Sequence, residues 1–300
     1  MVSKGKTING KEVKLLIFNP EHDLCLANGS ADFVPPQSAV DYARSSSAVM
    51  QSLYPDGLCR SVYDDLSAEG ITEVVAWGWN VTLKKRLLKA GIPESLLPTD
   101  EELSCWRALQ HRQTILPLQP DAHRIETAAQ VDKLLSSANR RWVLKAPWSG
   151  AGRGLHWIDG TLTPNDSAWL QKTVAQQGCV VAEPWRMTTM DFALEYYVRD
   201  GRLEFLGYSL FSTAHGVYRE NIILSDSEIR ARIESGSSPE ALAEKRNEVE
   251  QFLVSEIIPH YHGPVGVDFV IDDKGRIHLC EMNLRHTMGM VALSKLKVES

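Results

Sequence analysis

The chain has 300 residues, of which 43% are hydrophobic and 23% charged, and its formal net charge is −6. This length and balance are those of a globular protein with one large α/β unit or two to three smaller domains. The acidic charge argues against general nucleic-acid binding, which needs clustered Lys and Arg, and no stretch has the eighteen apolar residues of a membrane helix.

Five cysteines lie scattered along the chain, and none of them forms a CxxC pair. An odd number without such spacing argues against a disulfide framework or a zinc site and favours a reducing compartment. The basic N-terminal residues are not followed by an apolar run, so we expect no secretory signal and a cytoplasmic location. Nothing in the sequence indicates an oligomeric state.

The first third of the chain alternates short apolar runs with helical patterns. Strands are predicted at residues 13–19 and 73–77, and helices at 38–53 and 81–90, with Ser38 and Asn80 as N-caps. This order predicts βαβ units around a parallel sheet. Residues 92–100 hold two prolines and no long apolar run, so we place a boundary near Pro98, between domains 1–98 and 99–300.

The larger domain is predicted to contain both helices and paired strands. Helices are expected at residues 101–111, 127–136, 239–258 and 287–296, and strands at 142–146, 179–183, 191–199, 203–212 and in a hairpin over 265–282. The chain is therefore expected to be an α/β protein whose larger domain is built of α+β lobes.

The hairpin is the most informative segment, because a turn sequence at 272–275 joins two β-prone runs. If Ile271 pairs with Arg276, Gly266 lies opposite Glu281 and leaves open space on that face. Asp268 then becomes a diagonal neighbour of Glu281.

Side chains alternate along a strand, so Asp268, Glu281 and Asn283 are expected on one face of the hairpin. Two carboxylates and an amide oxygen are costly on an otherwise apolar face unless a cation or water satisfies them. Such oxygen ligands suit Mg²⁺ or Mn²⁺ together with nucleotide phosphates. The alternative is a solvent-facing hairpin without a metal.

A strand-end lysine and a glycine-rich loop follow each other at residues 142–154. Lys145 ends the strand, and the loop has glycines at Gly150, Gly152 and Gly154. Glycines let backbone N–H groups approach phosphate oxygens, and the lysine adds a positive charge. The alternative is a structural turn between strands, since the loop lacks the Walker spacing.

The strand at 179–183 ends in Glu183, beside which backbone groups could recognise an adenine edge. Asp191, eight residues later, could hydrogen-bond ribose hydroxyls. Taken alone, Glu183 is a weak signal.

These three features, in this order, resemble the ATP-grasp superfamily. The matching segments are VLKAPWSGAGRG, VVAEPW and a hairpin of the form VDFxxDxxGxxxxxExN, within about residues 100–289. The resemblance implies an ATP-grasp fold with ATP between two lobes, preceded by a Rossmann-like domain.

The resemblance also implies a role for each matching residue. Lys145 would contact nucleotide phosphates, and Arg285 would stabilise the phosphoryl group in transfer. Asp268, Glu281 and Asn283 would hold Mg²⁺. The flap over the phosphates would comprise Ser149, Gly150, Gly152, Arg153 and Gly154, and the adenine and ribose contacts would come from Glu183, Pro184, Trp185, Arg186 and Asp191.

The family often has a lysine for the α-phosphate on an early helix, and here Arg107 is the nearest candidate to replace it. The first βα loop often contacts the non-nucleotide substrate. Here it contains Glu21, His22 and Asp23, of which Glu21 or Asp23 would bind a substrate amine. The alternative for this loop is turn and capping chemistry.

The function implied is an ATP- and Mg²⁺-dependent ligase that joins a small-molecule carboxylate to an amine through an acyl phosphate. One alternative keeps the fold and phosphorylates a hydroxyl, as a kinase. The other is a nucleotide-binding module without turnover, which would have no need of the complete metal trio.

Overall fold

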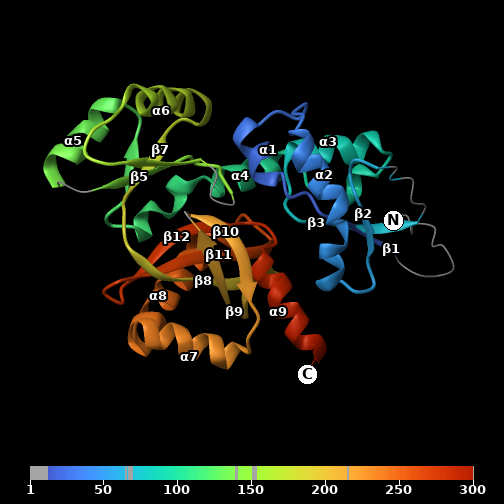
Figure 1. Cartoon of the computed structure of the whole chain (residues 1–300). Coiled ribbons are helices and arrows are strands. Elements are labelled where there is room, and N and C mark those ends of the chain that lie inside the picture. Colours follow the sequence, from blue (N-terminus) through green and yellow to red (C-terminus); the bar gives the residue numbers. More distant parts are fainter. Residues whose placement is uncertain are drawn as a thin grey trace.

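The computed structural model describes residues 13–64, 66, 70–138, 141–150, 154–214 and 216–299. Three sheets organise these residues, two at one side and one at the other side of the view in Figure 1. Within the described part, no helix is long and apolar enough to cross a membrane.

The N-terminal sheet is parallel, with β1 (Val13–Ile17) between β2 (Leu58–Arg60) and β3 (Ile71–Ala76). Helices α1 (His22–Asn28), α2 (Gln37–Ser45) and α3 (Val81–Lys89) follow these strands. The predicted parallel sheet is confirmed. The apolar run of β1 is fully buried at Leu15, Leu16 and Ile17, as expected for the central strand of a covered sheet.

The N-cap predicted at Asn80 is confirmed, because its side chain accepts a hydrogen bond from Leu83 N at 2.9 Å. The single helix predicted over residues 38–53 is wrong. Helix α2 begins at Gln37, after Pro36, and a separate 3-10 helix covers Ser47–Ser52. The break falls in a run of serines, whose hydroxyls compete with the helix for hydrogen bonds to backbone groups. Ser45 Oγ, for example, donates to Tyr42 O at 3.2 Å.

The second sheet is antiparallel and has the order β4-β7-β5-β6. Its helices α5 and α6 lie on the outer side of the strands in Figure 1. The elements are β4 (His123–Ile125), α5 (Ala128–Ala138), β5 (Trp142–Lys145), β6 (Leu155–Ile158), α6 (Pro164–Gln177) and β7 (Val180–Pro184). Together they form the β4–β7 lobe, with its own buried apolar cluster.

The third sheet is antiparallel and has the order β10-β9-β8-β11-β12. Its elements are β8 (Thr188–Arg199), β9 (Arg202–Ala214), β10 (Val217–Ile222), α7 (Asp226–Gly236), α8 (Pro239–Phe252), β11 (Gly263–Asp272), β12 (Ile277–Asn283) and α9 (Met288–Glu299). Helices α7 and α8 bury apolar side chains against this sheet in the largest core cluster. We call this part the C-terminal lobe.

Helix α4 (Asp100–Leu109) and a 3-10 helix at Arg112–Leu118 connect the N-terminal sheet to the β4–β7 lobe. A capping box between Thr99 and Glu102 begins α4, one residue after Pro98. The division into domains at this proline stays a prediction.

The segment between β12 and α9 is tied to the N-terminal sheet. His286 N donates to Trp77 O at 2.8 Å, and its Nδ1 lies 3.0 Å from Ala76 O. On the other side of the ring, Nε2 lies 2.9 Å from the Tyr54 hydroxyl. Burial lowers the pKa of His286 to about 4, so the neutral ring donates from Nδ1 and accepts at Nε2.

Candidate nucleotide and metal site

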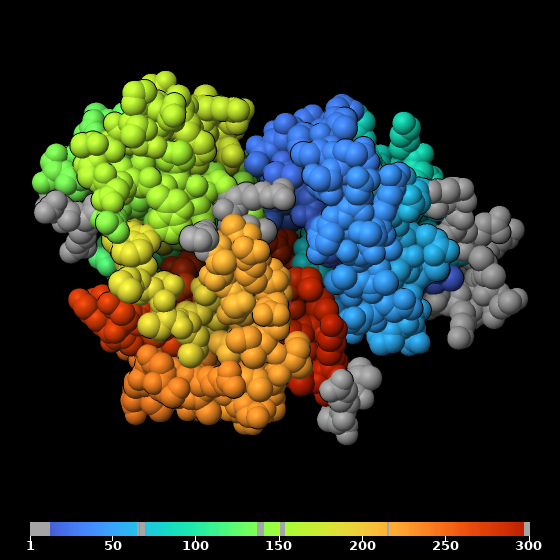
Figure 2. All heavy atoms as spheres, in the orientation of Figure 1, coloured from blue at the N-terminus to red at the C-terminus, as the bar shows by residue number. Residues whose placement is uncertain are grey.

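Two cavities, of about 680 and 710 Å³, lie between the sheets. The first is lined by residues around the N-terminal sheet, by the β4–β7 lobe and by the C-terminal lobe, and we call it the substrate cavity, after the substrate contacts that the resemblance implies for the first βα loop. The second lies between the β4–β7 lobe and the C-terminal lobe, and we call it the nucleotide cavity. Asp268 and Glu281 line both, so the two cavities meet at these carboxylates. The molecular surface is hollowed between β10 and the N-terminal residues (Figure 2).

The hairpin brings Asp268 and Glu281 together, but in a register different from the one predicted. Ile271 pairs with Ile277, and a bulge at Cys280 then sets Asp268 directly opposite Glu281. The turn is one residue longer than the prediction assumed, because Asp272 accepts hydrogen bonds from the backbone N–H groups of Lys274 and Arg276. The longer turn alone would have placed Glu281 and Asp268 on opposite faces of the hairpin. The bulge adds one residue and returns them to the same face.

Gly266 lies opposite Asn283 rather than Glu281, and the open space predicted beside it is wrong. A Cβ at this position would lie 2.5 Å from Thr287 Cγ2 and 3.0 Å from Glu195 Oε2. The glycine is therefore needed for close packing against these two side chains.

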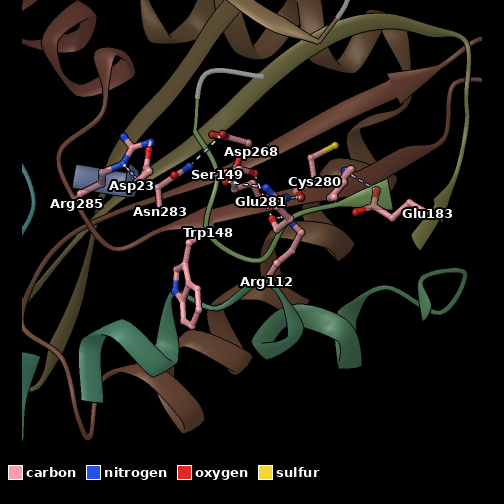
Figure 3. Close-up of polar contacts among 12 residues, drawn as sticks. Asp23, Arg112, Trp148, Ser149, Glu183, Asp268, Cys280, Glu281, Asn283 and Arg285 are labelled. Carbon is pink, nitrogen blue, oxygen red and sulfur yellow. Dashed lines mark hydrogen bonds and ion pairs between the residues drawn. The ribbon is translucent and has the colours of Figure 1, made fainter. Parts of the chain in front are cut away.

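Asp268, Glu281 and Asn283 gather on one face of the hairpin (Figure 3). Asn283 Nδ2 donates to Asp268 Oδ2 at 3.1 Å. The pKa of Asp268 is raised well above its usual value by burial and then by the charges of Glu281 and Glu195. A divalent cation would relieve this repulsion, and the oxygen-rich set suits Mg²⁺.

Within the described residues, no three His, Cys, Asp or Glu side chains form a group that could hold a metal ion. Among the described residues, the metal ligands predicted for this face are two carboxylates and one amide. That number is what Mg²⁺ needs when phosphate oxygens and water complete its coordination.

Arg112 is a site residue that the sequence analysis missed. Its Nη2 donates to Glu281 Oε1 at 2.9 Å and its Nη1 to Cys280 O at 2.8 Å (Figure 3). It lines the nucleotide cavity. The residue follows α4 within a 3-10 helix and belongs to no recognisable motif, so only the tertiary fold reveals its position.

Arg107, the candidate for the family's α-phosphate lysine, lies elsewhere. Its guanidinium stacks 3.9 Å from the centre of the Trp148 ring, and its Nε donates to Leu26 O at 2.8 Å. It lines neither cavity. The structure therefore favours Arg112 over Arg107 as the cation on this side of the nucleotide cavity.

Lys145 and Glu183 are diagonal neighbours on the antiparallel strands β5 and β7, where Glu183 lies opposite Val143 and Lys145 opposite Val181. Lys145 Nζ lies 2.6 Å from Glu183 Oε2, and both side chains line the nucleotide cavity. Glu183 is only 6% exposed, and a buried carboxylate needs a cation as its partner. Lys145 is that partner. The residues predicted for phosphate and for adenine thus share one wall.

The rest of the predicted adenine and ribose contacts line the same cavity: Pro184, Trp185, Arg186 and Asp191. Trp185 is 39% exposed. Asp191 accepts a hydrogen bond from the Thr213 hydroxyl at 3.0 Å, and burial raises its pKa. The structure brings these residues together on one cavity, and their contacts with adenine and ribose stay a prediction.

The glycine-rich loop is described at Ser149, Gly150 and Gly154, whereas Gly152 and Arg153 lie outside the described residues. Ser149 lines both cavities. At Gly150 a Cβ would lie 1.9 Å from Asp23 Oδ2, so the loop backbone packs directly on the first βα loop. Gly154 has φ +73°, a conformation that glycine adopts without strain.

Arg285 extends toward the N-terminal domain, where its Nη2 lies 3.2 Å from Asp23 Oδ2 (Figure 3). Both residues line the substrate cavity. The pKa of Asp23 is lowered by the Arg285 guanidinium, although burial opposes this. Asp23 is therefore already paired with a cation of the protein.

Glu21 also lines the substrate cavity, but His22 does not. Glu21 is 3% exposed, and its Oε1 accepts from the Tyr63 hydroxyl at 2.5 Å. Its Oε2 has no hydrogen-bond partner among the described residues. The His22 ring is buried between Asn80 and Gln110, at 3.0 and 3.2 Å, and burial lowers its pKa to about 4. These contacts give His22 a structural role.

Glu195 is a second residue that the sequence analysis missed. It lies in the middle of β8, lines the substrate cavity and is 1% exposed. Its carboxylate accepts from Ser209 Oγ at 2.9 Å and Thr287 Oγ1 at 2.8 Å. Burial raises its pKa to about 7, against the opposing effect of the two hydroxyls.

Comparison with known proteins supports this architecture. No model of a protein family matches the sequence, and no curated protein is similar to it. Solved structures are similar, including N5-carboxyaminoimidazole synthetase from Staphylococcus aureus complexed with ADP. That enzyme is 15% identical, with a TM-score of 0.55, over 97% of this chain and 78% of its own.

Two further structures have similar values. D-alanyl-alanine synthetase A from Vibrio cholerae is 14% identical over 96% of this chain and 93% of its own, with a TM-score of 0.52. D-cycloserine synthetase is 12% identical over 96% of this chain and 99% of its own, with a TM-score of 0.56. These are ATP-grasp enzymes, and this α/β chain has the ATP-grasp fold, as the three motifs predicted.

Proposed function

We propose that the chain is an ATP- and Mg²⁺-dependent, ADP-forming ligase, which joins a carboxylate to an amine through an acyl phosphate. The observation that carries this proposal is that the nucleotide and substrate cavities meet at Asp268 and Glu281. A terminal phosphate in one cavity and a carboxylate in the other would thus come together at the metal-binding face. The similar structures include a synthetase complexed with ADP, which supports a nucleotide site here.

ATP would lie in the nucleotide cavity. Glu183 and the backbone at Pro184–Arg186 would take the adenine, and Asp191 the ribose. Lys145 would exchange part of its contact with Glu183 for a phosphate, and Arg112, whose Nε lies 3.4 Å from Ala146 O, would supply a second cation nearby. Placing the reacting groups is the main contribution of the protein in phosphoryl transfer.

Mg²⁺, held by Asp268, Glu281 and Asn283, would neutralise charge on the transferring phosphoryl group. Arg285 lines the substrate cavity on the same side, and its planar guanidinium can hold two oxygens at once. In the structure it holds Asp23, so the incoming oxygens would compete with this carboxylate for Arg285.

Glu21 is the better candidate than Asp23 for binding the amine, because Arg285 holds both Asp23 oxygens, at 3.3 and 3.2 Å, whereas Glu21 Oε2 has no hydrogen-bond partner among the described residues. Arg86 lies 3.8 Å from the other Glu21 oxygen, Oε1. A buried carboxylate oxygen without a donor costs free energy, which an ammonium group would offset. The proposed substrates are small molecules, and the proposed location is the cytoplasm.

Hydroxylamine provides a direct test, since it converts an acyl phosphate into a hydroxamate whatever the natural amine. The enzyme is incubated with ATP, Mg²⁺, hydroxylamine and pools of small carboxylates, and ADP, phosphate and hydroxamates are measured by mass spectrometry. We expect ADP to form only with a productive carboxylate and Glu281→Gln to form none. A stable phosphorylated alcohol from a parallel pool of hydroxyl compounds would instead show a kinase.

A further inference from the structure

The N-terminal wall of the substrate cavity is aromatic. Phe18 follows β1, Trp77 follows β3 and Tyr42 lies on α2, and all three line the cavity. The Phe18 ring meets Tyr42 edge-on at 5.8 Å between centres and Trp77 at 5.0 Å. We call these three residues the aromatic wall.

The aromatic wall lies where ligands bind in parallel sheets, at the carboxyl ends of the strands. Phe18 and Trp77 are almost fully buried, whereas Tyr42 remains 50% exposed despite its contact with Phe18. A half-exposed ring on a buried aromatic cluster can still gain apolar contact. An added ring could adopt the edge-on geometry that the three residues already show.

Strand β10 closes the cavity from the opposite side. Tyr218 lines the cavity there, and its hydroxyl donates to Asn221 Oδ1 at 2.6 Å. Asn221 also lines the cavity, and its buried Nδ2 has no partner among the described residues. A buried amide donor without a partner costs free energy, and the described part of the protein supplies no acceptor for this one.

We propose that the non-nucleotide substrate carries a flat apolar ring, which binds against the exposed ring of Tyr42 on the aromatic wall, with a hydrogen-bond acceptor toward Asn221. This inference rests on the proposed function for the reacting groups, but the ring site can be tested without turnover. The remainder of the substrate extends from the ring past Glu21 toward Arg285, along residues that line the same cavity.

Two primary amines that differ in the ring serve as probes, 2-phenylethylamine and n-butylamine. Their dissociation constants are measured by saturation-transfer NMR on the full chain, with and without ADP and Mg²⁺. We expect 2-phenylethylamine to bind about tenfold more tightly, from the apolar and aromatic contacts of one ring. Equal binding of the two amines to the unsubstituted protein would overturn the proposal.

Variants show whether Tyr42 causes the preference for the amine with the ring. Tyr42→Ala should bring the two dissociation constants together, whereas Tyr42→Phe keeps the ring and should keep the preference. Val34→Ala is the matched control, since Val34 is 80% exposed in the same domain and lines neither cavity. A preference that survives Tyr42→Ala would also overturn the proposal.

The thermal shift caused by ATP and Mg²⁺, measured on the same proteins, separates the two proposals. A normal shift without ring preference contradicts only the ring site. Ring preference without any nucleotide shift contradicts only the ligase.

Discussion

Arg112 and Glu281 form an ion pair of 2.9 Å across the junction between the connecting segment and β12. The Arg112 side chain is 4% exposed, and the same guanidinium donates to the carbonyl of Cys280. One buried cation thus fixes both the proposed metal ligand and the bulge that orients it.

Replacing Arg112 by Ala should lower both stability and ATP affinity. The change leaves a carboxylate and a carbonyl without their buried donor, which costs about 3 kcal/mol in the free energy of unfolding. Urea denaturation measures this loss, and ATP titration should show a dissociation constant raised at least about tenfold, as for one lost charge-assisted contact. Arg230→Ala removes an exposed i,i+4 pair and should change stability little. Equal effects of the two changes would contradict the role of Arg112.

Glu281→Gln should abolish turnover while ATP binding stays measurable, because it keeps the shape and removes a proposed metal ligand charge. Asp268→Asn should lower activity in a way that higher Mg²⁺ partly restores, since one carboxylate remains. Steady-state rates across a Mg²⁺ series distinguish the two. Full activity of Glu281→Gln would show that the hairpin holds no catalytic metal.

ATP with Mg²⁺ should raise the melting temperature more than GTP with Mg²⁺ does. A ligand that binds only the folded state stabilises it, by about 2.7 kcal/mol at a hundredfold excess over its dissociation constant. The proposed hinge at Glu183 recognises adenine, so GTP should bind less well. Differential scanning fluorimetry gives the shifts, and identical values for both nucleotides would exclude an adenine-specific hinge.

Glu195→Gln should alter how stability depends on pH. The carboxyl has a pKa of about 7 in the folded protein and an ordinary value of 4.5, so the folded state binds the extra proton between these values. The stability contributed by the protonated group is therefore present at low pH and is lost as pH rises through 7.

The glutamine variant cannot lose a proton. Relative to the unsubstituted protein, its free energy of unfolding should rise by about 3 kcal/mol between pH 4.5 and 8, at about 1.4 kcal/mol per pH unit. Denaturant titrations at these pH values measure the difference. A constant difference across the range would mean that Glu195 does not titrate there.

Most of the longer strands and the positions of the three motifs could be predicted because their signals are local, whereas strands β2, β4, β6 and β10 were not predicted. Lys145 and Glu183 end apolar runs, and the hairpin strands alternate around a clear turn. Helix α7 was not predicted, although the sequence SDSE at residues 225–228 is a capping box that the structure shows. Helix α6 was not predicted either, although Thr163 and Pro164 mark its start.

The register of the hairpin depends on the bulge at Cys280, and no residue type announces such a bulge. Arg112 and Glu195 were missed for a related reason. Each has a partner far along the chain: Arg112 pairs with Glu281, and Glu195 accepts a hydrogen bond from Thr287. A single sequence carries no record of such partners, and only the folded arrangement does.

The His286 contacts have a mechanical consequence. The backbone and ring of this residue fasten the strand end that carries Asn283 and Arg285 to the edge of the N-terminal sheet. The residues that follow β12 and the N-terminal sheet are therefore held together beside the substrate cavity. If the protein closes over a nucleotide, we expect the β4–β7 lobe to move relative to these two parts and to carry Lys145 and Glu183 with it.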